Sequence, residues 1–106
     1  MIRGGRAALA VALLTGCAAV PHATPEDAAR AAGSWPGISV ADLEAGRSRY
    51  VARCTSCHRA RSPARYPPDR WGAHLDKMAE RARLSPDDRD LILRYLVTLA
   101  GRPATP

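Results

Sequence analysis

The chain has 106 residues, three cysteines and a formal net charge of +6, and it contains no phenylalanine. This length is enough for one small domain. Only 5% of the residues are aromatic, and no basic stripe with interleaved aromatic side chains is present, so nucleic-acid binding has no support.

The first sixteen residues have the pattern of a signal peptide. Arg3 and Arg6 precede the apolar run 7–14, which is far shorter than the roughly 20 residues that a helix needs to cross a bilayer. We therefore expect residues 1–16 to be removed on export. Their removal leaves 14 basic and 10 acidic residues, a formal charge of +4.

A cysteine follows this leader directly. The stretch Leu14-Thr15-Gly16-Cys17 resembles the bacterial lipobox, in which small residues precede a cysteine that is acylated and becomes the mature N-terminus. The resemblance implies that Cys17 is lipidated and anchors an exported protein to the periplasmic face of a membrane. Ala18 after it favours the outer membrane. An ordinary signal peptide with a chance cysteine is the alternative.

Residues 17–38 are rich in alanine and proline, with Trp35 as their large apolar side chain. This composition predicts a flexible tether. Twenty flexible residues have a root-mean-square span of roughly 25 Å, so we expect the tether to hold the domain off the membrane and let it reorient. Within it, Glu26–Ala32 is compatible with a short frayed helix, and Trp35 with docking on the domain.

Residues 39–101 are predicted to form the folded domain, and residues 102–106 a disordered tail. The domain has no strand-like alternation and its segments have helical spacing, so we expect an all-α fold of three to four helices. A domain this short buries only a marginal apolar core and usually needs a staple, such as a disulfide or a bound metal.

The first helix of the domain is predicted over Val40–Arg53, with Ser39 as its N-cap. Gly46 lies in the middle of this helix. A glycine there costs up to about 1 kcal/mol relative to alanine, so it usually marks a close approach by another element. We expect that element to be the last helix of the chain.

The five residues Cys54-Thr55-Ser56-Cys57-His58 have the strongest chemical signal. Two thiols at i and i+3 followed at once by an imidazole are the attachment pattern of a c-type haem. The sulfurs form thioethers to the haem vinyl groups, and His58 is placed for its ring nitrogen to reach the iron. One covalent haem c would also be the staple that a short domain needs.

Two other chemistries compete for these residues. A thioredoxin-like redox pair needs a βαβ context and a thiolate at a helix start, which the flanking sequence does not offer. A zinc site would use Cys54, Cys57 and two histidines, but it lacks a second cysteine pair and does not explain why His58 adjoins Cys57.

A proline-rich loop and a middle helix follow the motif. Prolines between residues 61 and 68 predict extended backbone there, and the carbonyl of Pro63 is a candidate acceptor for the second ring nitrogen of His58. Asp69 is predicted to cap a helix over Arg70–Arg83.

The last helix has the clearest terminal signals. Ser85 is its predicted N-cap, Pro86 occupies the first helical position, and Asp88 is placed for a capping-box contact. Gly101 and Pro103 end it. Its apolar face predicts packing on the other helices; that face consists of Leu91, Ile92, Tyr95, Leu96 and Leu99.

The helices around the motif resemble those of class I cytochromes c. The pairing of Gly46 and Tyr50 with Tyr95 and Leu96 resembles the crossing of the N- and C-terminal helices in that family. Residues 43–99 also resemble small single-haem domains in which a tryptophan is followed seven residues later by the ligand methionine, and then by a leucine, a capped helix and Tyr-Leu. The residues that match are Trp71, Met78, Leu84, Tyr95 and Leu96.

This resemblance implies a haem iron held by His58 and Met78. Met78 is the only methionine after the leader and lies seven residues after Trp71, on one helical stripe with Leu75. His74, one turn before Met78, is the alternative sixth ligand and would make a bis-histidine site of lower potential. The resemblance further implies haem packing by Trp71, Leu75 and Tyr95. His22, in the predicted tether, is discounted as a ligand.

With both axial positions filled, the iron has no open site for a substrate, so we expect an electron-transfer protein and not an enzyme. It would carry one electron at a time between redox partners in the cell envelope. Two alternatives remain open. One is a haem-based sensor whose sixth ligand is displaced by a gas, and the other is the haem subunit of a larger membrane redox complex.

Seven arginines and one acidic residue, Asp69, lie between residues 47 and 70 and bracket the motif. They predict a positive surface that docks an acidic redox partner through Arg59, Arg61 and Arg65. The alternative is an ordinary solvated surface on which one or two arginines pair with the haem propionates.

Overall fold

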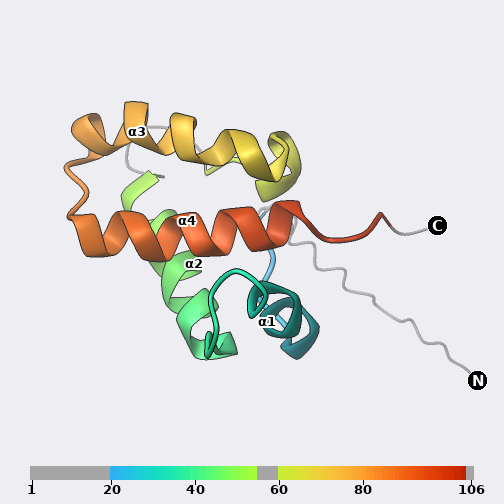
Figure 1. Cartoon of the computed structure of the whole chain (residues 1–106). Coiled ribbons are helices and arrows are strands. Elements are labelled where there is room, and N and C mark those ends of the chain that lie inside the picture. The colour runs from blue at the N-terminus through green and yellow to red at the C-terminus, as the bar shows by residue number, and fades with distance from the viewer. Residues whose placement is uncertain (1–19, 55–59, 105–106) are drawn as a thin grey trace, which may run out of the picture.

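The computed structural model describes residues 20–54 and 60–104, and that part of the chain contains helices and no strand (Figure 1). The expected all-α class is confirmed for these residues. No helix among them is long and apolar enough to cross a membrane. The elements in chain order are α1 (Pro25–Ala31), α2 (Val40–Cys54), the 3-10 turns η2 (Pro63–Arg65) and η3 (Pro68–Arg70), α3 (Trp71–Ala82) and α4 (Pro86–Ala100).

The crossing of α2 and α4 is the centre of the fold, and Gly46 makes it possible. A Cβ atom at Gly46 would lie 2.1 Å from the carbonyl oxygen of Leu91 and 2.9 Å from Cβ of Tyr95. Both distances are far below van der Waals contact, so only glycine lets the two backbones approach this closely. The predicted approach of the last helix at Gly46 is confirmed.

Side-chain caps begin both of these helices as the sequence predicts. Ser39 Oγ accepts a hydrogen bond from the backbone nitrogen of Asp42 at 3.0 Å, and the Asp42 carboxylate accepts one from the backbone nitrogen of Ser39 at 3.0 Å. Ser85 Oγ accepts from the backbone nitrogen of Asp88 at 3.0 Å. The capping-box contact predicted for Asp88 is absent, because its carboxylate binds arginines of α2 instead.

The prediction that Asp69 caps the middle helix is wrong. Residues 68–70 already form the turn η3, so α3 begins one residue later than predicted, and its N-cap position is occupied by Arg70 without a side-chain bond. The predicted extended loop likewise contains two 3-10 turns, because proline is well suited to the first position of a helical turn. α3 ends at Ala82, and its C-cap residue Arg83 has a left-handed backbone with φ 55°.

One hydrophobic core joins α2, α3 and α4. Helical spacing brings the apolar faces together as expected, and the aromatic rings fill the volume near the crossing. Tyr50 and Tyr95 lie with ring centroids 6.4 Å apart. The buried members of this core are Val20, Tyr50, Trp71, Leu75, Ile92, Tyr95, Leu96 and Leu99.

Residues 20–38 do not form the predicted flexible tether. Val20 is buried in the main core, and Ala31 and Ile38 are buried with Leu43 in a second cluster that Trp35 covers. The helix α1 lies beside the end of α4 (Figure 1). Alanine and proline here therefore belong to a packed segment, and the described part of the predicted tether is part of the domain.

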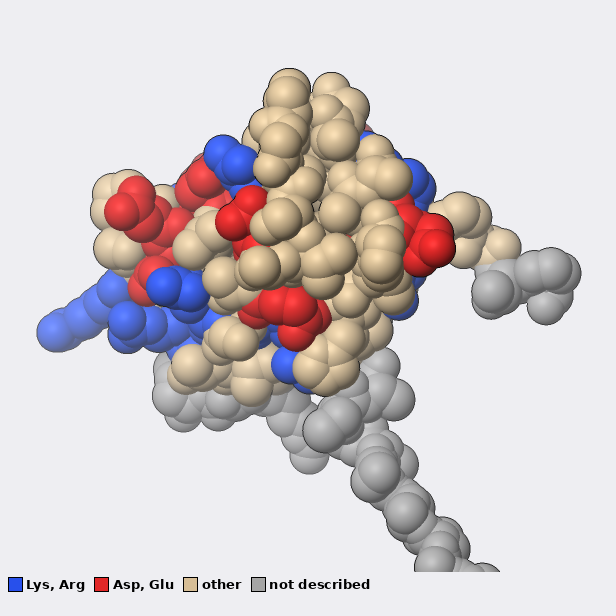
Figure 2. Space-filling model, turned by 90° about the horizontal axis from the view of Figure 1, so that it is seen from below, with Lys and Arg blue, Asp and Glu red and all other residues tan. Residues whose placement is uncertain are grey.

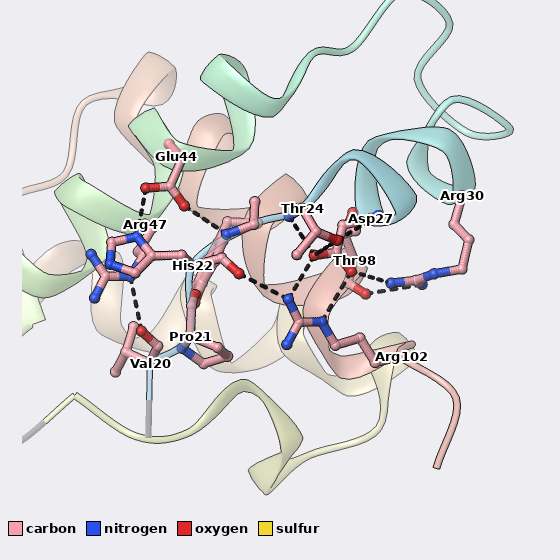
Figure 3. Close-up of polar contacts among 12 residues, drawn as sticks. Val20, Pro21, His22, Thr24, Asp27, Arg30, Glu44, Arg47, Thr98 and Arg102 are labelled. Atoms are coloured by element: carbon pink, nitrogen blue, oxygen red, sulfur yellow. Dashed lines mark hydrogen bonds and ion pairs between the residues drawn. The ribbon is translucent and has the colours of Figure 1, made fainter. Parts of the chain in front are cut away.

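The first residue of the predicted disordered tail, Arg102, is also bound to the domain (Figure 3). Arg102 donates hydrogen bonds to Asp27 in α1 and to the carbonyl oxygen of His22. The chain is thus held by side-chain contacts beyond the end of α4. Residues 105–106 lie outside the described part of the chain.

Candidate functional site

A cavity of about 190 Å³ lies between the C-terminal turn of α2 and one face of α3. Ala60 and Arg61 form a further wall, and Tyr66, between η2 and η3, forms another. The lining residues are Tyr50, Arg53, Cys54, Ala60, Arg61, Tyr66, Trp71, His74, Met78, Arg81 and Ala82.

Helical periodicity explains which side chains reach this cavity. In α2, Tyr50 and Cys54 are four residues apart, so they lie one above the other on the same face. In α3, the residues Trp71, His74 and Met78 are separated by three and four residues, which places all of them on one face as well. The cavity is therefore the space between two helical faces.

Sulfur and imidazole groups meet in this space. Cys54 is half-buried at the last residue of α2, and Met78 is half-buried on the opposite wall, packed against the main core. The His74 ring stacks on Tyr66, with ring centroids 3.7 Å apart and an angle of 24° between the planes. Both candidate sixth ligands thus line the same cavity as the first cysteine of the motif.

An aromatic wall fixes the shape of the cavity. Trp71 is buried, and its ring stands edge-on to Tyr66 at 5.0 Å and to Tyr50 at 6.2 Å. Its indole nitrogen donates a hydrogen bond of 2.8 Å to the carbonyl oxygen of Pro63. The carbonyl that the sequence assigns to His58 is therefore bound by Trp71, and this bond fixes both the ring and the loop.

The hydroxyl of Tyr50 closes the loop that contains the motif. It donates to the carbonyl oxygen of Arg61 at 2.8 Å and accepts from the backbone nitrogen of Arg61 at 2.9 Å. Burial raises the pKa of Tyr50 to about 12, so the phenol stays protonated and keeps both bonds at neutral pH. The chain thus returns to α2 within seven residues of Cys54.

Three guanidinium groups border the cavity, from Arg53, Arg61 and Arg81. Arg53 also reaches the carboxylate of Asp88 at 3.4 Å. A cavity that joins an aromatic wall to several arginines suits a flat apolar ligand with carboxylate groups at its edge, because guanidinium binds carboxylates strongly.

The other predicted site residues fall into two groups. Cys17, Cys57, His58 and Arg59 lie outside the described residues. Leu75 and Tyr95 are fully buried but belong to the core and do not line the cavity. The Tyr95 hydroxyl instead donates a hydrogen bond to the carbonyl oxygen of Pro21. His22, which the sequence discounts as a ligand, bonds to Glu44 at 2.9 Å.

The residues present fit a covalently attached haem. Cys54 supplies a thiol at the cavity wall, His74 and Met78 supply two alternative axial ligands, and the arginines match two propionates. The cavity volume of about 190 Å³ is below the roughly 300–1,000 Å³ of most small-ligand sites, so the cavity would enclose only part of a porphyrin. An exposed edge is what transfer of electrons to another protein requires.

Sequence reasoning missed several lining residues, among them Tyr50, Tyr66 and Arg81. Tyr50 is four residues before Cys54 and Arg81 is three residues after Met78, so helical spacing alone places both beside predicted site residues. Tyr66 lies between prolines in a loop, where no periodicity applies, and only the fold brings it onto His74.

Across residues 20–54 and 60–104, no group of three or more histidine, cysteine or acidic side chains is placed to hold a metal ion. No model of a known protein family matches the chain, and comparison with curated proteins and with solved structures also found no match.

Proposed function

We propose that the protein is a single-haem c-type cytochrome that carries one electron at a time between redox partners in the cell envelope. The observation that supports this most directly is the position of Cys54. It lines the same cavity as His74 and Met78, and the remainder of the attachment motif follows it within four residues.

In this proposal the chain holds the cofactor in three ways. The thiols of Cys54 and Cys57 would form the thioethers to the vinyl groups, and His58 and Met78 would ligate the iron. A bound haem c would supply reversible one-electron exchange between ferric and ferrous iron. No enzymatic step is assigned to the protein, because two ligands from the chain would leave no open position for a substrate.

The walls of the cavity would set the properties of such a site. Trp71 and Tyr50 would keep water from a bound ligand, and a thioether ligand in such a dry site would favour the ferrous state. Arg53 and Arg81 would pair with the two propionates and offset their negative charge. Each of these contributions comes from a side chain that already lines the cavity.

The proposed location is the periplasmic face of a membrane, with the outer membrane favoured. It follows from the lipobox resemblance at Cys17, since acylation there would anchor the exported chain. Intact-mass measurement of the mature protein should show a diacylglyceryl group, and Cys17→Ser should remove it. A wild-type protein found wholly in the soluble periplasm would contradict the anchor.

The attachment of haem is tested by producing the chain in a host with a cytochrome c maturation system. A denaturing gel stained for haem should show colour that survives boiling. The double variant Cys54→Ala, Cys57→Ala should lose the colour, while Cys17→Ser should keep it. Colourless wild-type protein from this host would exclude the proposed function.

The sixth ligand is tested with two substitutions one helical turn apart. Ferric wild-type protein should show the weak near-infrared band of methionine-to-iron ligation, and Met78→Ala should remove it while His74→Ala should keep it. The opposite result would assign the iron to His74. Ready binding of carbon monoxide by the ferrous wild-type protein would favour the sensor alternative.

A further inference from the structure

The ring of Tyr66 is held in place on the cavity wall. Trp71 is 1% exposed and stands edge-on to Tyr66, with ring centroids 5.0 Å apart and an angle of 83° between the planes. The indole nitrogen of Trp71 donates a hydrogen bond of 2.8 Å to the carbonyl oxygen of the buried Pro63. Pro67 follows Tyr66 and favours the extended backbone that Tyr66 has, with φ −129° and ψ 153°. The position of this ring therefore depends on the loop and on α3 together.

His74 packs the face of its ring on Tyr66. The ring centroids are 3.7 Å apart, and the planes are within 24° of parallel. The His74 ring also lies 6.1 Å from that of Trp71. Side chains of a helix lean towards its N-terminus, so the imidazole reaches back to the turn that begins α3. Tyr66, Trp71 and His74 thus form one cluster of three rings at the start of α3.

Met78 reaches a neighbouring part of the cavity. It follows His74 by four residues, which is about 6 Å along the helix axis. Its side chain is half-buried and packs against the main core. A thioether on three rotatable bonds adapts readily to the space that it lines. The two candidate ligands therefore start from different places in the cavity, and only one of them can take the sixth position of a single iron.

We propose that Tyr66 is a positioning residue that selects the sixth ligand: it holds the His74 imidazole against its own ring and leaves the iron to Met78. This inference rests on the proposed function, in which the cavity binds a haem. To ligate an iron within reach of Met78, the His74 ring would have to turn off Tyr66 and lose the stack. A stacked aromatic pair shifts such an equilibrium by roughly 2- to 10-fold.

The consequence concerns the reduction potential. A methionine ligand gives a haem iron a higher potential than a second histidine does. Tyr66 would therefore keep the potential high without contacting the iron, because it acts only through the position of His74. This role predicts an effect on ligation that loss of ordinary packing would not reproduce.

The test compares the full-length protein, with its haem attached, with Tyr66→Leu, which keeps an apolar side chain but has no ring to stack. We expect histidine-ligated haem to become several-fold more populated, because His74 is then free to turn. The near-infrared band of methionine ligation should weaken, and the reduction potential should fall. Near-infrared spectroscopy of the ferric protein and a redox titration measure the two effects.

Two further variants separate positioning from packing. Tyr66→Phe keeps the ring and should retain both the band and the potential. The double variant Tyr66→Leu, His74→Ala removes the competing imidazole and should regain the methionine band that Tyr66→Leu loses. If Tyr66 only supported the fold, the band would stay weak in the double variant.

An undiminished band in Tyr66→Leu, or a band that does not return in the double variant, would overturn the role of Tyr66. Histidine ligation in the wild type would overturn it too, and in each of these cases the attached haem leaves the proposed function standing. Colourless wild-type protein would instead contradict the proposed function. In such protein, proton NMR still tests the hold on His74, because the Tyr66 ring current should shift the imidazole protons upfield in the wild type and not in Tyr66→Leu. Unshifted protons in the wild type would overturn the stack itself.

Discussion

The side chains that surround the two ends of α4 differ in kind. At its C-terminal end, the ionised groups are bound by other groups of the chain: Asp27 by Arg30 and Arg102, and Glu44 by Ala23 and His22. Across the fold, between α2 and α3, a thiol, a thioether, an imidazole and guanidinium groups border an open volume, and its Arg53 side lies towards the N-terminal end of α4. The C-terminal end of α4 therefore holds segments of the chain together, whereas the cavity carries the side chains that could bind a ligand.

The comparison shows that a carboxylate with a strongly shifted pKa need not belong to a functional site. Burial alone would raise the pKa of Asp27, but hydrogen bonds from Arg102 and Thr24 overcome it and hold the pKa well below the usual range. Perturbed groups are often functional. Here the shift has a complete structural account, since Thr24 caps the helix that contains Asp27 and Arg102 ties that helix to the residues after α4.

The surface charges follow the same division. In the view of Figure 2, basic side chains gather at the end where α4 begins, and acidic side chains lie directly beside them. At this end, Arg49 and Arg53 of α2 both form ion pairs with Asp88. Part of the positive ring that the sequence predicts is therefore neutralised within the chain.

The largest predicted effect comes from the crossing that joins the two ends. Gly46→Ala places a Cβ atom 2.1 Å from the Leu91 carbonyl oxygen, so α2 and α4 must move apart. We expect the free energy of unfolding to fall by about 3 kcal/mol, with both the Asp27 contacts and the cavity disturbed. Chemical denaturation of the haem-loaded protein measures this.

The matched control is Gly72→Ala, also within a helix, where an added Cβ atom meets no other atom within 4 Å. We expect it to be neutral or to stabilise the protein by up to about 1 kcal/mol. Equal losses in the two variants would mean that glycine at residue 46 has no special role in the crossing.

The second prediction concerns a substitution that affects only the contacts of Asp27 at the C-terminal end of α4, called the closed end below. Asp27→Asn removes the negative charge that holds Arg30 and Arg102, and should cost about 2–3 kcal/mol of unfolding free energy. Because the folded-state pKa is depressed, this stabilisation is present above the ordinary pKa of 3.8 and is lost as pH falls below it. The wild type should therefore lose more stability than Asp27→Asn between about pH 5 and pH 2.

The exposed carboxylate of Asp76, which pairs with Arg89 at 2.6 Å and is 68% exposed, provides the control. Asp76→Asn should cost less than about 1 kcal/mol. We expect Asp27→Asn to leave the haem spectrum unchanged. A shift in that spectrum would mean that the two ends are not independent, and the comparison would fail.

Much of the helical framework can be predicted from local signals. Ser39, Ser85 and Gly46 each specify a feature that the structure contains, because caps and close approaches depend on single residues. The packing of residues 20–38 could not be predicted from composition, since alanine and proline are also common in linkers. The capping box of Thr24 and Asp27 was a readable sign that α1 is stable.

The candidate site divides in a similar way. Spacing along a helix places His74, Met78 and Trp71 on one wall, and the sequence identifies these residues correctly as neighbours. Leu75 shares their helix, but its position turns it into the core. Tyr66 reaches the cavity through tertiary packing, which no local pattern contains, whereas Arg81 is placed beside Met78 by helical spacing.

The third prediction tests the open end. Tyr50→Phe removes both bonds to Arg61 and should cost about 1–2 kcal/mol. The folded-state pKa of about 12 exceeds the ordinary 10.0, so the phenol stabilises the fold fully below pH 10 and this is lost as pH rises through 12. Tyr50→Phe should therefore weaken the alkaline loss of stability.

Tyr95→Phe is the matched variant for the closed end, because its hydroxyl bonds Pro21 and does not line the cavity. We expect Tyr50→Phe to shift the visible spectrum or the reduction potential of the haem, and Tyr95→Phe to leave both unchanged. A shift in Tyr95→Phe alone would place the haem against the core and not in the cavity.

The smallest predicted effect concerns docking at the open end. Arg61 and Arg65 are exposed, whereas Arg47 and Arg49 bind groups of the chain, so we expect the first pair to steer a partner. Steering acts on the association rate and is screened beyond roughly 8–10 Å at ordinary salt. Electron exchange with an acidic partner should slow as salt rises, and Arg61→Glu with Arg65→Glu should slow it at low salt.

The control for net charge is Lys77→Glu with Arg83→Glu, since both residues are exposed and neither lines the cavity. It makes the same change in total charge at positions away from the proposed docking surface. Stopped-flow rates at several ionic strengths compare the two double variants with the wild type. Equal slowing would mean that only net charge steers the partner. A rate that stayed flat across salt and in both variants would instead indicate contact through the apolar haem edge, because uncharged contacts are insensitive to screening.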